Sequence, residues 1–402
     1  MSNNNSSKDL PETPGRTKWG RDRLPHKQCC NSWSLWAILK KCLGKELYKI
    51  SMPVEFNEPL SFLQRLVETF EYVNLLDQAA NEPDPVRRMQ FVAAFAVASL
   101  SSNLNRMKKP FNPLLGETYE LDRSVSACLT AHEDGFRIMA EQVSHHPPIS
   151  AFYCASSKGE YEVEGCLNPR LKFWGRSVEI KPEGSIRVRF PKLNNEEYVW
   201  QNVDCCIHNI ILGTLYFEQY GDQFITCKET DLLCRINYKK ANGPTDIQLH
   251  SILGYIINKS GQKVSKISGR WCHEVYTSSM ADEESKPVWQ ATPRPPFAGD
   301  YYNFTTMAMA LNEKLPATCS AKLPSTDSRF RPDIRLLEEG DLDGASAEKH
   351  RLEEKQREAK KKQSKTSAEW KPLWFEKVTD VHWRYTGGYW DRASDKCSLD
   401  IF

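Results

Sequence analysis

The sequence predicts an α+β fold that is mainly β and is built on an antiparallel sheet large enough to curl. Between about residues 119 and 276, short runs that alternate apolar and polar side chains, such as residues 185–190 and 214–218, are punctuated by Gly, Asn and Pro. This texture is typical of many short strands joined by turns. Two stripes of apolar residues at helical spacing precede it, and a charged, helix-forming segment follows it.

The chain opens with a polar segment. Residues 1–31 are rich in Asn, Ser, Lys, Arg and Pro and hold scarcely any apolar residues, so we expect a disordered leader. From residue 32 to about residue 50 the pattern changes, because Trp33, Trp36, Leu39 and Leu43 recur at three- and four-residue intervals. This spacing predicts a short amphipathic helix. Amphipathicity leaves open whether that helix lies on a membrane, covers a cavity as a lid, or packs as an ordinary core helix.

Two further helices are predicted before the strands, over about residues 60–80 and 85–103. After the strands, residues 278–287 predict a surface loop, and residues 288–311 resume an aromatic, Pro-broken strand pattern. Residues 345–362 predict a solvated helix that begins after Asp343 or at Ser346, either of which can cap it. The last stretch, from Trp370 to Trp390, is too aromatic for a free tail and is expected to pack onto the body.

Composition excludes several classes of protein. Of the 402 residues, 40% are hydrophobic and 11% aromatic, enough for a substantial core, and the formal net charge of +2 offers no strong field for nucleic acid. Thirteen cysteines, without a Cys-x-x-Cys pair or a signal peptide ahead of them, favour reduced thiols in the cytosol. No apolar run approaches the roughly 20 residues that span a bilayer, so any membrane contact is expected to be peripheral.

The most unusual local sequence is residues 141–148, Glu-Gln-Val-Ser-His-His-Pro-Pro, in which His145 and His146 are adjacent. Successive strand residues point to opposite sides, so the two imidazoles converge on one ligand only if the backbone turns or bulges there. Otherwise one histidine would be buried and the other exposed. No metal site is expected, because neither a His-x-x-x-His helix nor a Cys pair supplies further zinc ligands. Cys154 could act as a nucleophile, but no oxyanion-forming Gly loop accompanies it, and no catalytic residue is predicted.

Two other segments combine charge with fixed geometry. The first is the loop around Lys109 and Asn112, where prolines immobilise a cation, an amide and apolar groups, a mixture that suits the mouth of an apolar cavity. The second is the charged helix, where Lys349, Glu353 and Arg357 follow at four-residue steps and share one face, so that Glu353 can hold both cations. Taken alone, the first segment is more typical of a solvated connector, and the second is more typical of a solvated salt-bridge face.

Residues 141–148 resemble the fingerprint of the oxysterol-binding-protein-related family. Further blocks look like those of the family and together cover nearly everything after about residue 32; they comprise residues 52–65, 109–117, 323–329, 331–333 and 353–357. Residues 36–50, 171–175 and 389–391 look closest to the subgroup of related proteins one and two. The chain is identified as a member of this family on these motifs.

The resemblance implies a large incomplete antiparallel β-barrel around a hydrophobic tunnel. The lipid-binding domain would be residues 32–402, with a lid at about 32–50, helices at about 60–103, the barrel at about 109–311 and a C-terminal helical subdomain at about 323–402. The tunnel would exchange a sterol, cholesterol or an oxysterol, for a phosphoinositide, PI4P or PI(4,5)P2. This exchange needs no covalent chemistry and no cofactor.

The resemblance also implies the site residues. His145 and His146 would bind the phosphate, with the mouth loop and the C-terminal helix completing a phosphoinositide headgroup site that comprises Lys109, Asn112, His145, His146, Lys349, Glu353 and Arg357. The expected setting is the cytosol, with transient peripheral contact at endoplasmic reticulum, plasma membrane, endosome or Golgi contact sites. The leader lacks the two-aromatic acidic motif that tethers many members to the endoplasmic reticulum.

Three alternatives are weighed against lipid exchange. The same cavity could serve a sensor or scaffold whose loading changes partner binding. Phosphatidylserine could replace the sterol, because tunnel-lining residues follow no short motif. An enzyme acting on a lipid ester through Cys154 or His145 would need oxyanion or metal machinery that the sequence does not supply.

Overall fold

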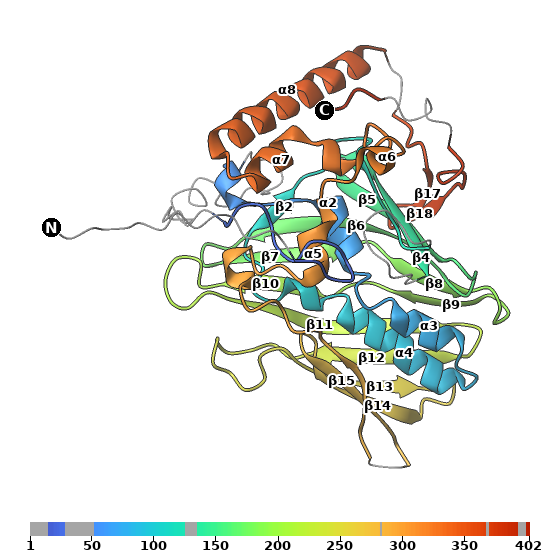
Figure 1. Ribbon diagram of the computed structural model, residues 1–402. Coiled ribbons are helices and arrows are strands. Elements are labelled where there is room, and N and C mark those ends of the chain that lie inside the picture. Colours follow the sequence, from blue (N-terminus) through green and yellow to red (C-terminus); the bar gives the residue numbers. More distant parts are fainter. Residues whose placement is uncertain (1–14, 29–51, 125–134, 282–283, 367–369, 393–398) are drawn as a thin grey trace.

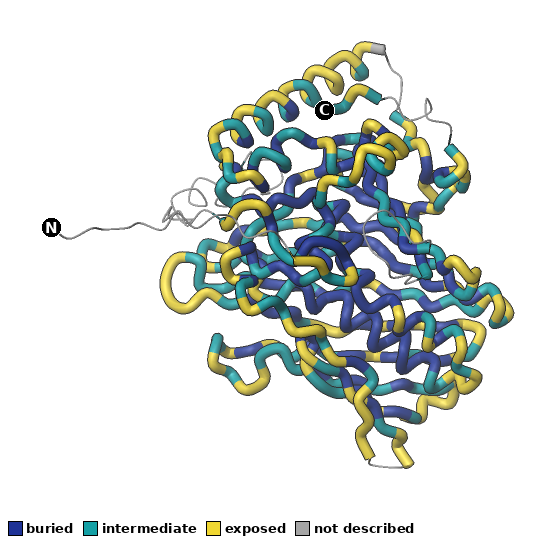
Figure 2. Tube along the Cα trace, in the orientation of Figure 1, coloured by how far each residue is buried: buried dark blue, intermediate teal, exposed yellow. Residues whose placement is uncertain are grey.

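The computed structural model describes residues 15–28, 52–124, 135–281, 284–366, 370–392 and 399–402 (Figure 1). Trp33, Trp36, Leu39 and Leu43 of the predicted lid helix lie outside the described residues. The body is a large curled sheet with helices packed against it and a long helix across one end. Figure 2 shows that buried residues fill the inside of the curled sheet, whereas the long helix at the top is exposed along its outer side.

Among the described residues, fourteen strands form the main sheet, and neighbouring strands run antiparallel. These strands are β3 (Thr118–Asp122), β4 (Phe136–His145), β5 (Pro148–Ser156), β6 (Glu162–Phe173), β7 (Ser177–Glu183), β8 (Ile186–Phe190), β9 (Glu196–Trp200), β10 (Asp204–His208), β11 (Tyr216–Cys227), β12 (Leu232–Tyr238), β13 (Ser251–Ile257), β14 (Lys263–Arg270), β15 (Glu274–Ser279) and β16 (Lys286–Gln290). The strand-rich middle of the chain therefore agrees with the prediction.

Two long strands curl the sheet. β6 and β11 have 12 residues each, enough for each strand to pair with different neighbours along its length. β6 pairs first with β8 and then with β7, while β11 pairs first with β10 and then with β9 and β12. Because β7 pairs with β10 and β8 with β9, these strands close a ring, whereas β3 and β16 end the strand order without pairing to each other. The predicted incomplete antiparallel barrel is confirmed.

β4 is buried on both faces, which explains why its apolar residues do not alternate with polar ones. Phe136 and Ile138 belong to the main core inside the sheet. Met139 and Val143 point to the opposite face and belong to a second core that includes Trp383 of the C-terminal segment. This sandwiched position holds the end of β4, where the adjacent histidines lie, firmly in place.

The helices before the barrel are α2 (Phe62–Glu68), α3 (Asn74–Ala80) and α4 (Pro85–Ala98), so the single helix predicted over residues 60–80 is in fact two. Ser61 and Gln64 form a capping box that starts α2. The chain between α2 and α3 turns through shorter-range hydrogen bonds and buries Phe70, whose ring contacts Phe95 of α4 and Phe152 of β5. The periodic apolar pattern persists through this turn, which is why the sequence did not reveal it.

The C-terminal part contains more varied structure than predicted. Its elements and the remaining short ones are η3 (Val54–Phe56), β1 (Asn57–Ser61), η4 (Ser101–Asn103), β2 (Lys109–Phe111), η5 (Ala298–Asp300), α5 (Thr306–Leu311), α6 (Ala317–Ser320), η6 (Ser328–Phe330), α7 (Pro332–Glu338), α8 (Leu342–Thr366), β17 (Phe375–Thr379) and β18 (His382–Tyr385). The predicted strand pattern at residues 306–311 is wrong, since Thr305 caps a helix there. The predicted start of α8 is also wrong, because Asp341 accepts from Gly344 N at 2.8 Å and the helix begins earlier.

The aromatic C-terminal stretch packs onto the body, as predicted. It forms the β17–β18 hairpin, so the region predicted to be helical from about residue 323 also contains strands. Trp374, Phe375, Trp383 and Tyr389 are buried against β4–β6. Burying these rings fixes the C-terminal segment beside the β4–β5 turn.

The prediction of a disordered leader is wrong for residues 15–28, which pack on the body. Trp19 and Leu24 are only 6% and 2% exposed and belong to the main core. Arg21 Nε donates to Met309 O at 2.6 Å, and its guanidinium also pairs with the buried Glu338. A polar segment with few apolar residues is ordered here because the body, and not the segment itself, supplies most of the surface that becomes buried.

Candidate functional site

The two adjacent histidines sit where β4 turns into β5. The pairing register shifts between Gln142 and Ser144, so β4 carries the kind of irregularity that lets neighbouring side chains converge. Gln142 supports this shape, because its Oε1 accepts from Ser150 Oγ at 2.6 Å and its Nε2 donates to Ser144 O at 2.8 Å. The rings of His145 and His146 lie 4.5 Å apart, half-buried and exposed respectively, and both line one cavity.

Glu141, the first residue of the motif, has a structural role. Its side chain is fully buried, and its two carboxylate oxygens accept hydrogen bonds from Leu373 N at 2.9 Å and Trp374 N at 3.0 Å. Burial raises the pKa of Glu141 to about 7, although the two N–H donors oppose this shift. The carboxyl group thereby ties the C-terminal segment to β4.

A glutamine on α8 fixes the orientation of His145. Gln356 Oε1 accepts from Leu115 N at 3.1 Å, which turns its amide nitrogen toward His145 Nε2, 2.5 Å away. Because that amide can only donate, His145 Nε2 accepts, and the proton of the neutral ring is assigned to Nδ1. Nδ1 is buried and has no hydrogen-bond partner among the described residues. The site therefore holds an N–H donor that lacks an acceptor.

Lys109 and Asn112 lie in a loop that buried polar groups hold in place. Asn57 Nδ2 donates to Lys109 O at 3.1 Å, where β1 pairs in parallel with β2. The guanidinium of Arg331, whose side chain is 3% exposed, donates to Asn112 O at 2.9 Å and to Glu117 Oε2 at 2.8 Å. The loop is thus anchored through its backbone, which leaves the Lys109 and Asn112 side chains free to line the cavity.

Lys349, Glu353 and Arg357 share one face of α8, as predicted. Lys349 Nζ donates to Glu353 Oε1 at 2.8 Å and to Met52 O at 2.8 Å. Arg357 Nη2 donates to Glu353 Oε2 at 3.3 Å, so Glu353 holds both cations. Arg357 is half-exposed, whereas the Lys349 side chain is only 15% exposed. The helix therefore presents one enclosed and one accessible cation.

All seven residues of the predicted headgroup set line a single cavity of about 200 Å³. They come from three parts of the chain: the loop at β2, the β4–β5 turn and α8. We call this space the headgroup cavity; its lining is Met52, Asn57, Lys109, Phe111, Asn112, Leu114, His145, His146, Pro148, Arg331, Lys349, Leu352, Glu353, Gln356 and Arg357.

Burial and like charges depress the basicity of two groups in the headgroup cavity. Burial, reinforced by the charge of Lys349 and opposed by Glu353, lowers the pKa of Lys109 to about 8. Burial, followed by the charges of His146 and Lys360, lowers the pKa of His145 to about 4. A negatively charged group in the cavity would reverse both shifts, because it favours the protonated forms.

The headgroup cavity joins a second, apolar cavity inside the barrel. This tunnel, of about 260 Å³, shares Met52, Lys109, Asn112 and Pro148 with the headgroup cavity. Apolar side chains from the helices and from inward faces of the barrel strands line it, among them Phe62, Leu66, Leu167, Leu171, Val178, Ile180 and Phe217. The arrangement suits a molecule with a polar anionic head and an apolar body.

Two residues that line the headgroup cavity, Gln356 and Arg331, were not predicted from the sequence. Gln356 lies seven residues after Lys349, which places it on the same face of α8, and this spacing could have identified it. Arg331 belongs to a recognised block, but its contact with Asn112 depends on the folded chain. No sequence pattern indicates that contact.

The described residues show neither an activated thiol at Cys154 nor a cluster of metal-binding side chains. Burial raises the pKa of the Cys154 thiol well above its usual value, the opposite of an activated nucleophile. Within the part of the chain that the structure describes, His, Cys, Asp and Glu do not gather in groups that could hold a metal ion. None of the described helices is long and apolar enough to cross a membrane.

Comparisons with known proteins identify the family of the chain. Residues 34–394 match the model of the family described as oxysterol-binding protein. The chain is 40% identical to oxysterol-binding protein-related protein 2 of Mus musculus, over 98% of this chain and 90% of that protein. It is 43% identical to oxysterol-binding protein-related protein 1 of Rattus norvegicus over 90% of this chain, and the match spans only 42% of that longer relative.

Solved structures share the fold. The Osh1 ORD domain in complex with ergosterol matches with a TM-score of 0.84 and 34% identity, over 95% of this chain and 94% of that one. The Osh3 ORD of Saccharomyces cerevisiae in complex with PI(4)P matches with a TM-score of 0.79 and 34% identity, over 93% and 95%. The solved domains of this fold thus include one with a bound sterol and another with bound PI(4)P.

Proposed function

Because the chain belongs to the oxysterol-binding protein family, we propose that it carries one lipid at a time and exchanges a sterol for a phosphoinositide between membranes. The family and the fold are those of lipid-binding proteins and not of enzymes. The proposed setting is the cytosol, with transient contact at membrane surfaces where two organelles approach each other.

One observation carries the proposal: the polar headgroup cavity adjoins the apolar tunnel, and four residues line both spaces. A phosphoinositide would place its phosphorylated head beside His145 and His146 and its acyl chains in the tunnel. A sterol would use the tunnel alone. Both ligands would need the same apolar space, so binding of one would exclude the other.

The headgroup cavity supplies what a phosphomonoester requires. Such a group carries roughly −1.5 to −2 charges near neutral pH. His145 Nδ1–H offers a donor without an acceptor, and Lys109, Lys349 and Arg357 would contribute charge-assisted hydrogen bonds. Glu353 would keep two of these cations apart and oriented in the empty site.

The tunnel supports reversible binding. Hiding a few hundred Å² of apolar lipid surface gains roughly 25 cal/mol per Å², which is comparable with what the lipid loses on leaving a bilayer. A carrier needs this near-balance, since a lipid bound much more tightly than the membrane holds it would not be delivered. The crystal complexes of the Osh1 ORD domain with cholesterol and with ergosterol support a sterol as the second ligand.

Native mass spectrometry of the full chain after incubation with mixed liposomes tests the proposal. The liposomes contain cholesterol, PI4P, PI(4,5)P2 and phosphatidylserine, and the variant is His145→Ala/His146→Ala. Two lost charge-assisted hydrogen bonds, each about 1.5–3 kcal/mol, should reduce phosphoinositide loading at least about a hundredfold and leave cholesterol loading intact. His350→Ala, an exposed histidine elsewhere on α8, is the matched control.

The outcomes separate the alternatives. One phosphoinositide per chain, displaced by cholesterol, supports exchange. Displacement by phosphatidylserine but not by cholesterol would replace the sterol in the proposal. Loading without any transfer between donor and acceptor liposomes would favour a sensor. Equal phosphoinositide loading of the double variant and the wild type would overturn the site assignment.

A further inference from the structure

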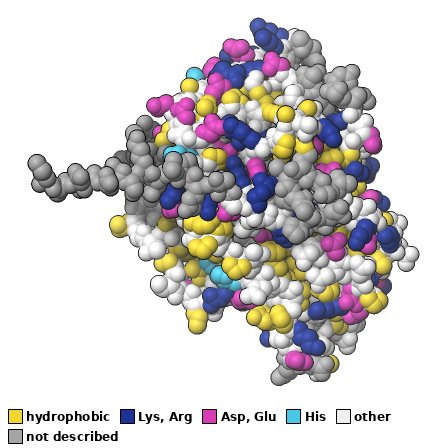
Figure 3. Space-filling model, viewed as in Figure 1, with side chains coloured by type: hydrophobic (Ala, Val, Ile, Leu, Met, Phe, Trp, Pro, Cys, Tyr) yellow, Lys and Arg dark blue, Asp and Glu magenta, His cyan; other side chains and the backbone are white. Residues whose placement is uncertain are grey.

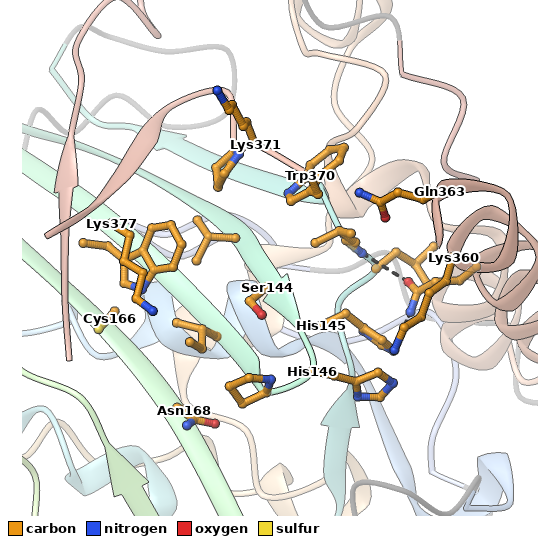
Figure 4. A pocket seen from close by; sticks show the side chains of 18 of the residues that line it. Ser144, His145, His146, Cys166, Asn168, Lys360, Gln363, Trp370, Lys371 and Lys377 are labelled. Atoms are coloured by element: carbon orange, nitrogen blue, oxygen red, sulfur yellow. Dashed lines mark hydrogen bonds between the residues drawn. The ribbon is translucent and has the colours of Figure 1, made fainter. Parts of the chain in front are cut away.

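A larger cleft shares a wall with the headgroup cavity. The wall consists of Leu114, His145, His146 and Gln356, which line both spaces, and the cleft has a volume of about 1060 Å³. α8 between residues 355 and 363, β6, and the C-terminal segment with the β17–β18 hairpin form its other sides (Figure 4). Lys109 and Asn112 do not line it, although Leu114 and Leu115 of the same loop do, and we call this space the basic cleft.

Positive charge predominates in the basic cleft. Three of its cations are balanced by acids on its own wall, in the pairs Arg170–Glu183 at 2.6 Å, Lys355–Asp400 at 2.6 Å and Lys377–Asp380 at 2.7 Å. Lys360, Lys362 and Lys371 form no ion pair or hydrogen bond with any residue that the structure describes. Figure 4 shows Lys360 on α8 and Lys371 on the C-terminal segment at different sides of the space.

Positive charge on α8 acts on the cleft. Figure 3 shows Lys and Arg side chains at the top of the molecule, with Asp and Glu side chains beside them. The positive charge of Lys360 is felt at His145, which lines the cleft. This charge is the third cause of the lowered pKa of His145, after burial and the charge of His146. An anion that approaches this end of α8 would be drawn toward the cleft.

Two indole groups add neutral donors to the basic cleft. Nε1 of Trp370 and Nε1 of Trp383 are buried and have no hydrogen-bond partner among the described residues, and both side chains line the cleft. Trp383 is only 7% exposed. Six other described indoles also have a buried Nε1 without a partner, so these two are not by themselves evidence of a ligand.

We propose that the basic cleft is a second anion site, which binds an organic polyphosphate that is either free in solution or presented as the head group of a membrane lipid. Three lysines without acidic partners line this concave space, two on α8 and one on the C-terminal segment, and this arrangement favours several phosphates over one. The apolar side chains of Val143 and Ile149 in the same lining suit the carbon skeleton that bears them. This site is additional to the headgroup cavity and does not depend on lipid exchange.

Titration of the full chain with inositol hexakisphosphate, followed by calorimetry, tests the second site. Lys360→Gln/Lys371→Gln removes two cations of the cleft and should weaken binding at least about tenfold. The matched control is Lys361→Gln/Lys365→Gln, which removes the same charge from exposed positions of α8 that do not line the cleft. The reciprocal variant is Lys349→Ala/Arg357→Ala, which affects the headgroup cavity alone.

Separation of the two sites supports the proposal. Hexakisphosphate binding should be lost in Lys360→Gln/Lys371→Gln and kept in Lys349→Ala/Arg357→Ala, whereas PI4P loading should follow the opposite pattern. Equal weakening by the control pair would reveal only general attraction to the basic end of α8 and would overturn the proposal. So would hexakisphosphate binding that disappears with the headgroup cavity, or no binding at all.

A second experiment determines whether the polyphosphate is soluble or is the head group of a membrane lipid. Flotation with phosphatidylcholine vesicles that contain PI(4,5)P2 is measured for Lys349→Ala/Arg357→Ala, with and without Lys360→Gln/Lys371→Gln. A loss of flotation of about tenfold on adding the cleft substitutions assigns the site to a lipid head group. Unchanged flotation together with loss of hexakisphosphate binding assigns it to a soluble polyphosphate.

Discussion

The headgroup cavity and the tunnel meet at Lys109 and Asn112, yet they are built in opposite ways. The headgroup cavity collects charged side chains from three distant parts of the chain and holds them with ion pairs and backbone hydrogen bonds before any ligand is present. The tunnel lies inside the curved barrel, and its lining comes mainly from apolar side chains of the helices and of the inward strand faces. One region can select by charge and geometry, while the other can select only by size and apolar surface. A single substitution in each region should therefore have different consequences for the two proposed ligands.

Among single substitutions, the largest effect is expected in the tunnel, where the two ligands should be affected equally. Leu171→Trp places an indole in the tunnel and should weaken cholesterol and PI4P binding alike. If the ring denies either ligand about 100 Å² of buried apolar surface, the loss is about 2.5 kcal/mol, or roughly seventyfold. Equilibrium binding of a fluorescent sterol and of PI4P measures both ligands on one variant.

Leu171→Met is the control for this substitution, because it nearly conserves volume and should leave both affinities within about threefold of the wild type. Thermal unfolding shows whether the larger side chain also perturbs the barrel. Selective loss of one ligand in a folded Leu171→Trp variant would mean that sterol and phosphoinositide do not occupy the same part of the tunnel.

A smaller, selective effect is expected at Gln356, which positions His145 and contacts no part of the tunnel. Gln356→Leu removes the amide that holds the imidazole with its proton on Nδ1, and should weaken PI4P binding about tenfold while sparing cholesterol. Nitrogen chemical shifts of the imidazole report the tautomer directly. Loss of affinity without a change in His145 tautomer would contradict a positioning role, and Glu358→Gln, at an exposed site on the same helix, should change neither property.

The two regions also differ in how far the sequence predicted them. The seven residues of the predicted headgroup set were proposed because the short blocks that contain them resemble those of the family, and the structure places all seven around one cavity. The curvature of the barrel was not identifiable in detail, because it depends on β6 and β11 each changing partners along their length. Such pairing joins residues far apart in sequence and follows no local period.

The same contrast explains the remaining errors. Residues 15–28 are ordered by surface that the body provides, and the helix at residues 306–311 depends on the cap from Thr305 within an otherwise strand-like, Pro-broken stretch. The turn between α2 and α3 preserves an apolar period while changing the hydrogen bonds. In each case tertiary context outweighed local pattern.

The smallest predicted effect is a pH dependence that should appear in the headgroup cavity and not in the tunnel. Burial holds the pKa of Lys109 in the empty site at about 8, below its usual value. A phosphate dianion beside it favours the protonated amine, so the pKa is higher in the complex than in the free protein. Binding then takes up a proton above about pH 8, and affinity falls as the pH rises through that value. Between about pH 7 and pH 8.5, PI4P affinity should fall three- to fourfold.

Cholesterol binding is the internal control for this pH dependence, because the sterol carries no charge with which a titrating group could interact. Lys109→Arg keeps a cation that stays protonated throughout this range, so its PI4P affinity, whatever its absolute value, should be flat with pH. A parallel fall for cholesterol would indicate a global change in the protein. A fall that persists in Lys109→Arg would place the titrating group elsewhere and would remove Lys109 from the phosphate contacts, leaving the headgroup cavity to act through His145 and α8 alone.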